Sequence, residues 1–258
     1  MKITKIEKKK RLYLLELDET EQLYVTEDTI VRFMLTKGMT ITTEAFEDIK
    51  TFAQFSYGKN LALYHLSFKQ RTEKEVKDYL LSHEISEATI PKVLDNLKAD
   101  KWLDDRRYAE SFAQQNLTSG DKGAYVLKQK LAQKGIAKPL LDEVFEGLDF
   151  SDLASKVAEK LLRKYQAKLP SKSLKDKIIQ SLQTKGFGYA EALAAFEALA
   201  IDKDEEQEEK LIYKELDKQH RRLSKKYDGY DLKQRLTQAL ARKGYDYDDI
   251  RSALKDYL

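Results

Sequence analysis

The chain has 258 residues, no cysteine, and 47 lysines and arginines against 44 aspartates and glutamates, which gives a formal net charge of +3. The lack of cysteine excludes disulfides and thiolate metal sites and favours a reducing compartment, while the near balance of charges argues against strong binding to nucleic acid. Because no apolar run approaches the ~20 residues that span a bilayer and the N-terminus lacks a signal-peptide core, we expect a cytoplasmic protein without membrane partners.

The first 58 residues predict a small module that contains β-structure. Residues 12–17 and 22–25 are rich in leucine, tyrosine and valine, and the polar residues 18–21 between them indicate a turn. This pattern predicts a small antiparallel sheet. Since a lone hairpin is marginal in water, the module must pack on the helices that follow.

Two helices are predicted to complete this module. Thr26 has the residue type of a helix N-cap and predicts a short helix through Met34, which residues 37–39 end. A further helix is expected to begin around Thr43, and its apolar side is formed by four residues: Ala45, Phe46, Ile49 and Phe52.

Beyond this module, the same hydrophobic frame recurs around three glycines, Gly135, Gly186 and Gly244. Apolar residues recur eight and four positions before each glycine and one, six, ten and thirteen positions after it: Leu127, Ile178 and Leu236; Leu131, Leu182 and Leu240; Ile136, Phe187 and Tyr245; Leu141, Ala192 and Ile250; Phe145, Phe196 and Leu254; Leu148, Leu199 and Tyr257. A fourth copy lies upstream, with Glu84 in place of the glycine: Val76, Leu80, Ile85, Ile90, Leu94 and Leu97. A period of about 50 residues indicates a modular array.

Each copy of this frame predicts three helices. The steps of four before the glycine define one helical face, and the apolar residues six to thirteen positions after it define a second. Glycine in the left-handed conformation closes the first of these helices, whereas Glu84 either adopts a positive φ at modest cost or ends its helix with a different turn. A further helix is expected upstream of each pair: over residues 104–117, from Ser151 and from near Asp204, and for the first copy over the run with Leu61, Leu63, Tyr64 and Leu66.

We therefore expect a mainly α-helical fold. Four tandem three-helix repeats would form an elongated, curved array that follows the small N-terminal β-containing module. The predicted boundaries are 1–58 for the N-terminal module and 59–103, 104–150, 151–201 and 202–258 for the repeats.

The sequence shows no pattern typical of an enzyme. The three histidines, His65, His83 and His220, fall on separate repeats without the paired spacing of metal ligands. The Gly-Phe-Gly run at 186–188 lacks the third glycine and the preceding strand of a dinucleotide loop. No phosphate-binding loop and no nucleophile elbow occur, so we expect no catalytic residue, no cofactor and no metal.

Basic residues supply the candidate binding site. Lys134, Lys185 and Lys243 each directly precede a repeat glycine, and two interpretations stay open: a row of cations for a partner, or favourable charges at helix C-termini. Other cations lie near helix starts, where the helix dipole disfavours them, and this placement favours a partner-facing role: Lys122, Lys175, Lys177, Lys233 and Arg235. The candidate set also includes Lys128 and Lys130.

Residues 102–112, Trp-Leu-Asp-Asp-Arg-Arg-Tyr-Ala-Glu-Ser-Phe, resemble a signature of the RecX family, bacterial regulators of the RecA recombinase. The lysine-glycine run at 127–136 is similar to that family's next motif, and residues 3–6 with the β-rich start resemble its longer Gram-positive members. The resemblance covers nearly the whole chain. Ala124 departs from it, because proline is frequent in the family after the glycine at this place.

The signature also suggests roles for its residues. Asp104 or Asp105 can cap the helix, and Tyr108 and Phe112, one turn apart, are expected in the core. Arg107 has two open interpretations: an intramolecular pair with a neighbouring carboxylate, or a contact to a partner.

The resemblance implies a non-enzymatic regulator of RecA in homologous recombination, DNA repair and the SOS response. Such a protein would bind the groove of the RecA–DNA filament as a monomer and limit strand exchange, ATP hydrolysis and coprotease activity. The alternative is a helical-repeat protein that binds single- or double-stranded DNA directly through its lysines, with an affinity that falls steeply with salt.

Overall fold

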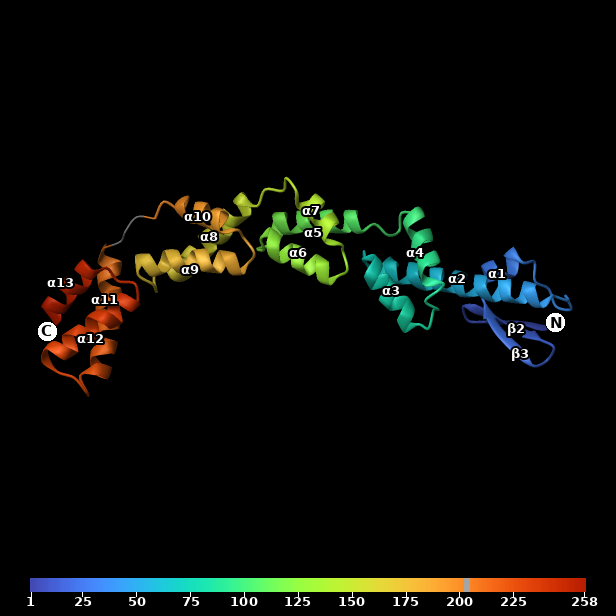
Figure 1. The fold of residues 1–258 in the computed structure, drawn as a ribbon, viewed down its shortest axis with the longest axis horizontal. Coiled ribbons are helices and arrows are strands. Elements are labelled where there is room, and N and C mark those ends of the chain that lie inside the picture. The colour runs from blue at the N-terminus through green and yellow to red at the C-terminus, as the bar shows by residue number, and fades with distance from the viewer. Residues whose placement is uncertain (202–204) are drawn as a thin grey trace. The chain divides into compact units, whose positions relative to one another are not determined.

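The computed structural model describes residues 1–201 and 205–258, which form thirteen helices and one three-stranded sheet (Figure 1). They divide into two compact units, Met1–Phe112 with Leu131–Val144, and Ala113–Lys130 with Phe145–Leu258. Among the described residues, no helix has the combined length and apolar character needed to cross a bilayer. The predicted mainly helical fold with a β-containing start is confirmed.

The N-terminal sheet has the order β1 (Ile3–Lys9), β2 (Leu12–Leu17) and β3 (Glu21–Val25), with both pairs antiparallel. The hairpin of β2 and β3 was predicted, whereas β1 was not. Four of its seven residues are charged, and Ile3 and Ile6 are three positions apart because the register shifts between Ile3 and Lys5, so the two-residue alternation of a strand is absent from the sequence. Ile3 is nevertheless fully buried, and Ile6 pairs with Leu15 in the register.

Two helices follow the sheet, each with a threonine N-cap. Thr26 Oγ1 accepts a hydrogen bond from the Thr29 backbone N–H at 3.3 Å and begins α1 (Glu27–Arg32). This helix ends at Arg32, before the predicted Met34, because Met34 takes a φ of +47° that no helix continues. Thr42 caps α2 (Thr43–Phe68) by accepting from the Ala45 N–H at 3.1 Å.

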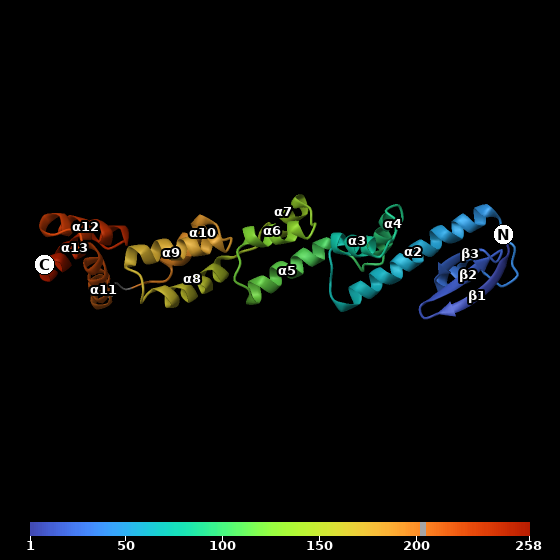
Figure 2. The same ribbon diagram turned by 90° about the horizontal axis from the view of Figure 1, so that it is seen from below.

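Helix α2 belongs to two cores. Its first half packs on the sheet through Phe46, Ile49 and Ala53 (Figure 2). Its second half packs with α3 (Glu73–Ser82) and α4 (Ile90–Ala99) around a separate cluster. The helix runs without interruption past the predicted boundary between residues 58 and 59, so the boundaries of the five modules stay a prediction.

The other repeats contain three helices each in the described part of the chain: α5 (Asp105–Ser119), α6 (Ala124–Gln133) and α7 (Lys138–Phe145); α8 (Ser151–Tyr165), α9 (Ser171–Thr184) and α10 (Tyr189–Glu197); α11 (Glu205–Leu223), α12 (Gly229–Arg242) and α13 (Tyr247–Tyr257). The frame leucines four positions before each glycine, Leu131, Leu182 and Leu240, are fully buried. The expected helix start near Asp204 and the repeat boundary at 202 lie outside the described residues.

The prediction that Tyr108 and Phe112 lie in the core was wrong in part. Both rings are half-buried, whereas Ala109 and Ala113 of the same helix are fully buried. The two alanines, and not the aromatic rings, are therefore the fully buried residues of this helix face.

The repeat glycines end their helices as predicted. Gly135, Gly186 and Gly244 have φ values of +94°, +96° and +89°. In the first of these turns the Ile136 N–H donates to the Leu131 carbonyl at 3.1 Å, the long bond of a Schellman cap. Glu84 adopts the same turn with a φ of +61°, so the first of its two interpretations is confirmed.

Leu131→Ala tests whether the frame leucines hold the repeats together. Leu131 is fully buried, so its truncation should lower the free energy of unfolding by about 2–5 kcal/mol. Leu81→Ala is the matched control, because Leu81 is 38% exposed and should lose well under that amount. Urea unfolding followed by circular dichroism measures both, and equal losses would contradict the assigned core.

Candidate functional site

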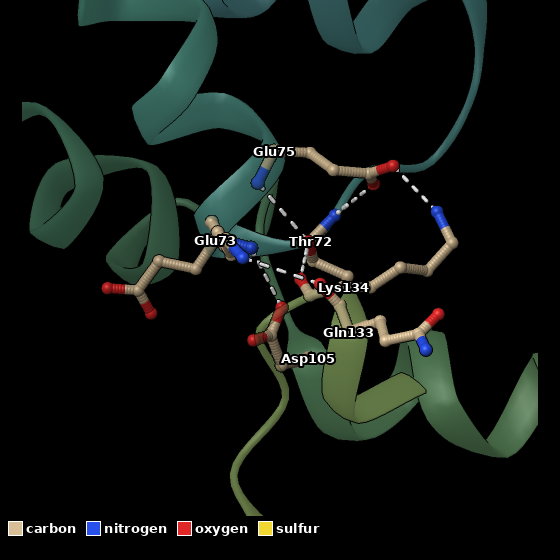
Figure 3. A network of polar contacts seen from close by, with 7 residues as sticks. Thr72, Glu73, Glu75, Asp105, Gln133 and Lys134 are labelled. Atoms are coloured by element: carbon tan, nitrogen blue, oxygen red, sulfur yellow. Dashed lines mark hydrogen bonds and ion pairs between the residues drawn. The ribbon is translucent and has the colours of Figure 1, made fainter. Parts of the chain in front are cut away.

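A polar network joins the first two repeats (Figure 3). The buried Thr72 hydroxyl, the N-cap of α3, donates to the backbone carbonyl of Lys134 at 2.7 Å. The Lys134 ammonium extends back to Glu75, where Nζ and Oε1 are 2.6 Å apart. The C-terminal end of α6 therefore meets the N-terminal end of α3, so that helix poles of opposite partial charge face each other.

The same network uses the two aspartates of the signature differently. Asp104 Oδ1 accepts from the Arg107 N–H at 2.9 Å and caps its own helix α5. Asp105 Oδ1 instead accepts from the Glu73 N–H of α3, also at 2.9 Å. The open choice between the two caps is resolved, because Asp104 caps α5 and Asp105 caps the preceding repeat.

The pKa values of two acids in this network, Asp105 and Glu75, are shifted in opposite directions. Burial raises the pKa of Asp105, even though the Glu73 N–H donates to its carboxylate. Burial alone would also raise the pKa of Glu75, but the hydrogen bonds from Lys134 and from the Thr72 N–H outweigh it and lower that pKa. The hydrogen bond to Glu75 raises the pKa of Lys134. The network thus holds the Lys134–Glu75 pair ionised near neutral pH.

The second unit contains two junctions built in the same way. At one, the backbone carbonyl of Lys185 accepts from the Gly123 N–H at 2.9 Å, and the Lys185 ammonium pairs with Asp121. At the other, the Lys243 carbonyl accepts from the Ser173 hydroxyl at 2.7 Å. In each case the residue before a repeat glycine contacts the start of the preceding repeat's second helix.

At the starts of α3 and α9, a carboxylate from the following repeat also accepts a hydrogen bond. Glu208 of α11 accepts from the Ser171 N–H at 3.0 Å and from its hydroxyl at 2.6 Å, as Asp105 does for α3. An acid at a helix N-terminus satisfies unpaired N–H groups and complements the dipole. The N-termini of α3 and α9 are therefore capped from the next repeat.

These junctions decide between the two interpretations of the repeat lysines. Lys134 and Lys185 are half-buried, and their ammonium groups pair with carboxylates of the preceding repeat. Lys243 lies 4.0 Å from Glu215 of its own repeat. The ammonium groups of Lys134 and Lys185 therefore serve the junctions, whereas Lys243 contacts the preceding repeat through its backbone carbonyl alone.

The predicted binding residues of the second repeat are placed differently from one another. Lys122 is half-buried, its backbone is bound by Asn116, and its ammonium lies 3.2 Å from Asp121. The Lys128 ammonium lies 5.6 Å from the centre of the Phe145 ring. Lys130 is exposed. Lys122 thus contributes to the local fold, while Lys130 is open to a partner.

The basic residues of α9 and α12 occupy two frame positions and do not form one patch. Lys175 and Lys233 share the first position, and Lys177 and Arg235 share the second. Residues two positions apart on a helix point in different directions, and Lys175 accordingly lies over Phe196, at 5.8 Å from the ring centre. Lys177 lies 6.0 Å from the centre of Tyr165. Lys233 is exposed at the frame position of Lys175.

A matching pair stands in the last repeat. The Arg235 guanidinium lies 3.9 Å from the centre of the Tyr227 ring, and Arg235 occupies the frame position of Lys177. Both cations are exposed, and each covers a tyrosine at the end of its repeat's first helix or just beyond it. Lys177 and Arg235 thus occupy the same frame position in two repeats, and each forms a cation–aromatic pair with a tyrosine of its own repeat, although Tyr165 and Tyr227 stand at different frame positions.

Arg107 lies at a small hollow that the sequence did not predict. The Trp102 hollow, as we call it, has a volume of about 50 Å³ and is lined by residues that include Arg71, Lys101, Trp102, Asp104, Arg107 and Tyr108. Within the described residues the Arg107 side chain forms no ion pair, whereas its neighbour Arg106 pairs with Glu143. The intramolecular pair considered for Arg107 is therefore formed by Arg106. Two residues of the hollow, Arg71 and Lys101, were not singled out in the sequence because they lie between helices, outside the repeat frame, and Trp102 was noted only as the first residue of the signature.

Comparison with known proteins gives three family descriptions along the chain. Residues 59–97 match "RecX, first three-helix domain", residues 104–144 match the second such domain, and residues 149–196 and 205–254 match the third. The third description thus matches twice, which agrees with four three-helix repeats.

Full-length relatives and solved structures agree with this result. The chain is 67% identical to "Regulatory protein RecX" of Streptococcus sanguinis and 64% identical to that of Streptococcus thermophilus, over the whole of each chain. A crystal structure of regulatory protein RecX superposes with a TM-score of 0.63 at 29% identity, covering 76% of this chain and 98% of the other. RecX from Lactobacillus salivarius superposes with a TM-score of 0.54 at 33% identity, covering 57% and 96%.

Thr72→Val tests the bond between repeats. The variant loses both the cap of α3 and the donor to the Lys134 carbonyl. Thr42→Val is the matched control, since Thr42 caps α2 with no bond to another repeat. We expect about 1 kcal/mol of lost stability for the control and a further ~0.5–1.5 kcal/mol for Thr72→Val. Urea midpoints measure both, and equal losses would exclude a stabilising junction.

The opposite pKa shifts predict opposite effects on acid stability. The lowered pKa of Glu75 gives stability above the unfolded value of about 4.3, which is lost as the pH falls through the folded value. Glu75→Gln should therefore flatten the loss of stability in acid. The raised pKa of Asp105 works in the other sense, since protonation there favours the folded state, and Asp105→Asn should steepen that loss.

Unfolding free energies measured from about pH 7 to about pH 4 give these slopes. Glu110→Gln, an exposed glutamate on α5, controls for the removal of one carboxylate. Slopes that change in the same direction for the Glu75 and Asp105 variants would contradict the assigned roles.

Proposed function

The chain belongs to the RecX family, and on that premise we propose that it regulates the RecA recombinase as a non-enzymatic modulator bound in the groove of the RecA–DNA filament. Its relatives carry the name of regulatory proteins, which supports a regulatory role. We propose further that it limits strand exchange, ATP hydrolysis and the SOS coprotease function, and that it acts in the cytoplasm as a monomer.

The observation that supports filament binding is the recurrence of an exposed cation at one frame position, Lys177 and Arg235, each lying on a tyrosine of its own repeat. Two successive repeats present an exposed cation on an aromatic ring at the same frame position. Arginine, tyrosine and cations on aromatic faces are common in interfaces. A surface that repeats along one chain suits a partner that itself repeats, since each small contact adds to the avidity of the whole.

Direct binding to DNA is the second candidate function. Lys130 and Lys233 are exposed, and within the described residues no ion pair neutralises them. Phosphate contacts by such cations would make the affinity fall steeply as salt rises. Titration of labelled single-stranded DNA at two salt concentrations tests this candidate, and an affinity independent of salt would exclude it.

A paired charge reversal tests the proposed RecA contact. The variant Lys177→Glu with Arg235→Glu changes one cation in each of two repeats. The control Lys160→Glu with Lys218→Glu changes exposed lysines on the first helices of the same repeats. RecA-catalysed, DNA-dependent ATP hydrolysis is measured against the concentration of each protein.

We expect the unaltered protein and the control to inhibit hydrolysis alike. The Lys177 and Arg235 variant should need at least about tenfold more protein, equivalent to about 1.4 kcal/mol of binding. Unaltered ATP hydrolysis with the parent protein in excess would overturn the proposed function. Equal loss in both variants, with unchanged melting, would overturn the assigned surface.

A further inference from the structure

The outer edge of strand β1 is only partly occupied. The sheet order places β1 at one edge, with β2 along its other side (Figure 2). Within the described residues, main-chain hydrogen bonds from outside the sheet reach this strand and the residues before it only at positions 1–3. An edge strand presents a row of unpaired N–H and C=O groups, and here that row runs along residues 4–9.

A short segment already pairs with the start of this edge. The Ile3 N–H donates to the Met39 carbonyl at 2.9 Å, and the Gly38 N–H donates to the Ile3 carbonyl at 2.8 Å. On its N-terminal side this segment turns away, because Gly38 has a φ of +89° and Leu35 is buried in the core of the module. The segment 38–41 therefore shows that the edge accepts an added strand, and it leaves the rest of β1 free.

The free part of the edge is strongly basic. Residues 1–11 contain one carboxylate, that of Glu7, against six cations: Lys2, Lys5, Lys8, Lys9, Lys10 and Arg11. The Glu7 carboxylate is engaged on its own strand, because it forms ion pairs with Lys5 and Lys9. Lys8 and Lys10 are exposed, and neither forms an ion pair in the part of the chain that the structure describes. The edge thus combines unpaired main-chain groups with cations that lack a carboxylate.

Charge selects the occupant of this edge. Like charges that stand opposite each other on paired strands are destabilising, whereas opposite charges stabilise the pair. Lysines on an edge strand therefore prevent pairing with a basic strand, including β1 of a second copy, and admit an acidic one. A nucleic-acid strand can neutralise the lysines, but it has no main-chain N–H groups for the free carbonyls of β1.

We propose that residues 4–9 of β1 bind an extended acidic segment of a partner protein, which adds to the sheet as a further strand with its carboxylates toward Lys8 and Lys10. In this mode of peptide recognition, main-chain hydrogen bonds supply affinity and side chains supply specificity. The inference goes beyond the proposed regulation of RecA, because the surface proposed for RecA lies on α9 and α12.

The experiment uses the full-length protein and a fluorescein-labelled peptide of about eight residues in which glutamate alternates with valine, long enough to cover the free part of β1. Fluorescence anisotropy measures its dissociation constant. A second peptide keeps the glutamates and has proline in place of each valine, so that it carries the same charge but cannot donate to a strand. Lys8→Glu with Lys10→Glu is compared with Lys77→Glu with Lys92→Glu, which changes exposed lysines on α3 and α4.

We expect the alternating peptide to bind the parent protein and the Lys77 and Lys92 control alike. The proline peptide should bind at least about tenfold more weakly, and the Lys8 and Lys10 variant should lose a similar factor for the alternating peptide. Amide hydrogen exchange in residues 4–9 should slow at saturating peptide. Melting temperatures are measured in parallel, and Lys8→Gln with Lys10→Gln replaces the charge reversal if that variant melts lower than the control.

Four outcomes would overturn the inference. The first is no binding of the alternating peptide, and the second is equal binding of the alternating and proline peptides, which would indicate charge attraction without an added strand. The third is unchanged hydrogen exchange in residues 4–9 at saturating peptide. The fourth is tighter binding of an oligothymidylate of matched charge that the Lys8 and Lys10 variant abolishes, which would assign these lysines to nucleic acid. None of these measurements contains RecA, so they are independent of the fate of the proposed function.

Discussion

The structure depends on the meeting of helix ends at each junction between repeats. The last carbonyls of a helix and its first N–H groups lack partners within that helix. Here the carbonyl of Lys134, Lys185 or Lys243 accepts from the start of the preceding repeat's second helix. The donor is a side-chain hydroxyl, of Thr72 or Ser173, at two junctions and the Gly123 N–H at the third. Each contact satisfies a carbonyl at a helix end and brings opposite poles of two helix dipoles together.

This junction explains why glycine occurs where it does. The turn needs a positive φ, and the preceding repeat approaches so closely that a Cβ on Gly135 would lie 2.4 Å from the Lys74 Cβ. Both constraints exclude a larger side chain. Glu84 has the first constraint alone, because its side chain is exposed and it belongs to the first repeat, which no other repeat precedes. A glutamate is tolerated there at the modest cost of a left-handed residue.

The same junction separates structural cations from those that can serve a partner. Lysines that directly precede the repeat glycines are held near their own backbone contact, where carboxylates neutralise Lys134 and Lys185. Cations elsewhere keep their charge for other uses: Lys177 and Arg235 lie on tyrosines, and Arg107 borders the Trp102 hollow. The basic residues that we propose to contact a partner are therefore among those that the junctions leave unpaired.

The sequence by itself determined the helical repeats, their glycine turns and their buried leucines, because hydrophobic periodicity and caps are local properties of the chain. It also determined the family, through residues 102–112 and the three matched domains. Tertiary structure decided the rest. Asp105 caps a neighbouring repeat, Arg106 rather than Arg107 finds a carboxylate, and Trp102 lies beside Arg71. Such pairings join residues far apart in sequence or choose between neighbours, and only the folded chain fixes those distances.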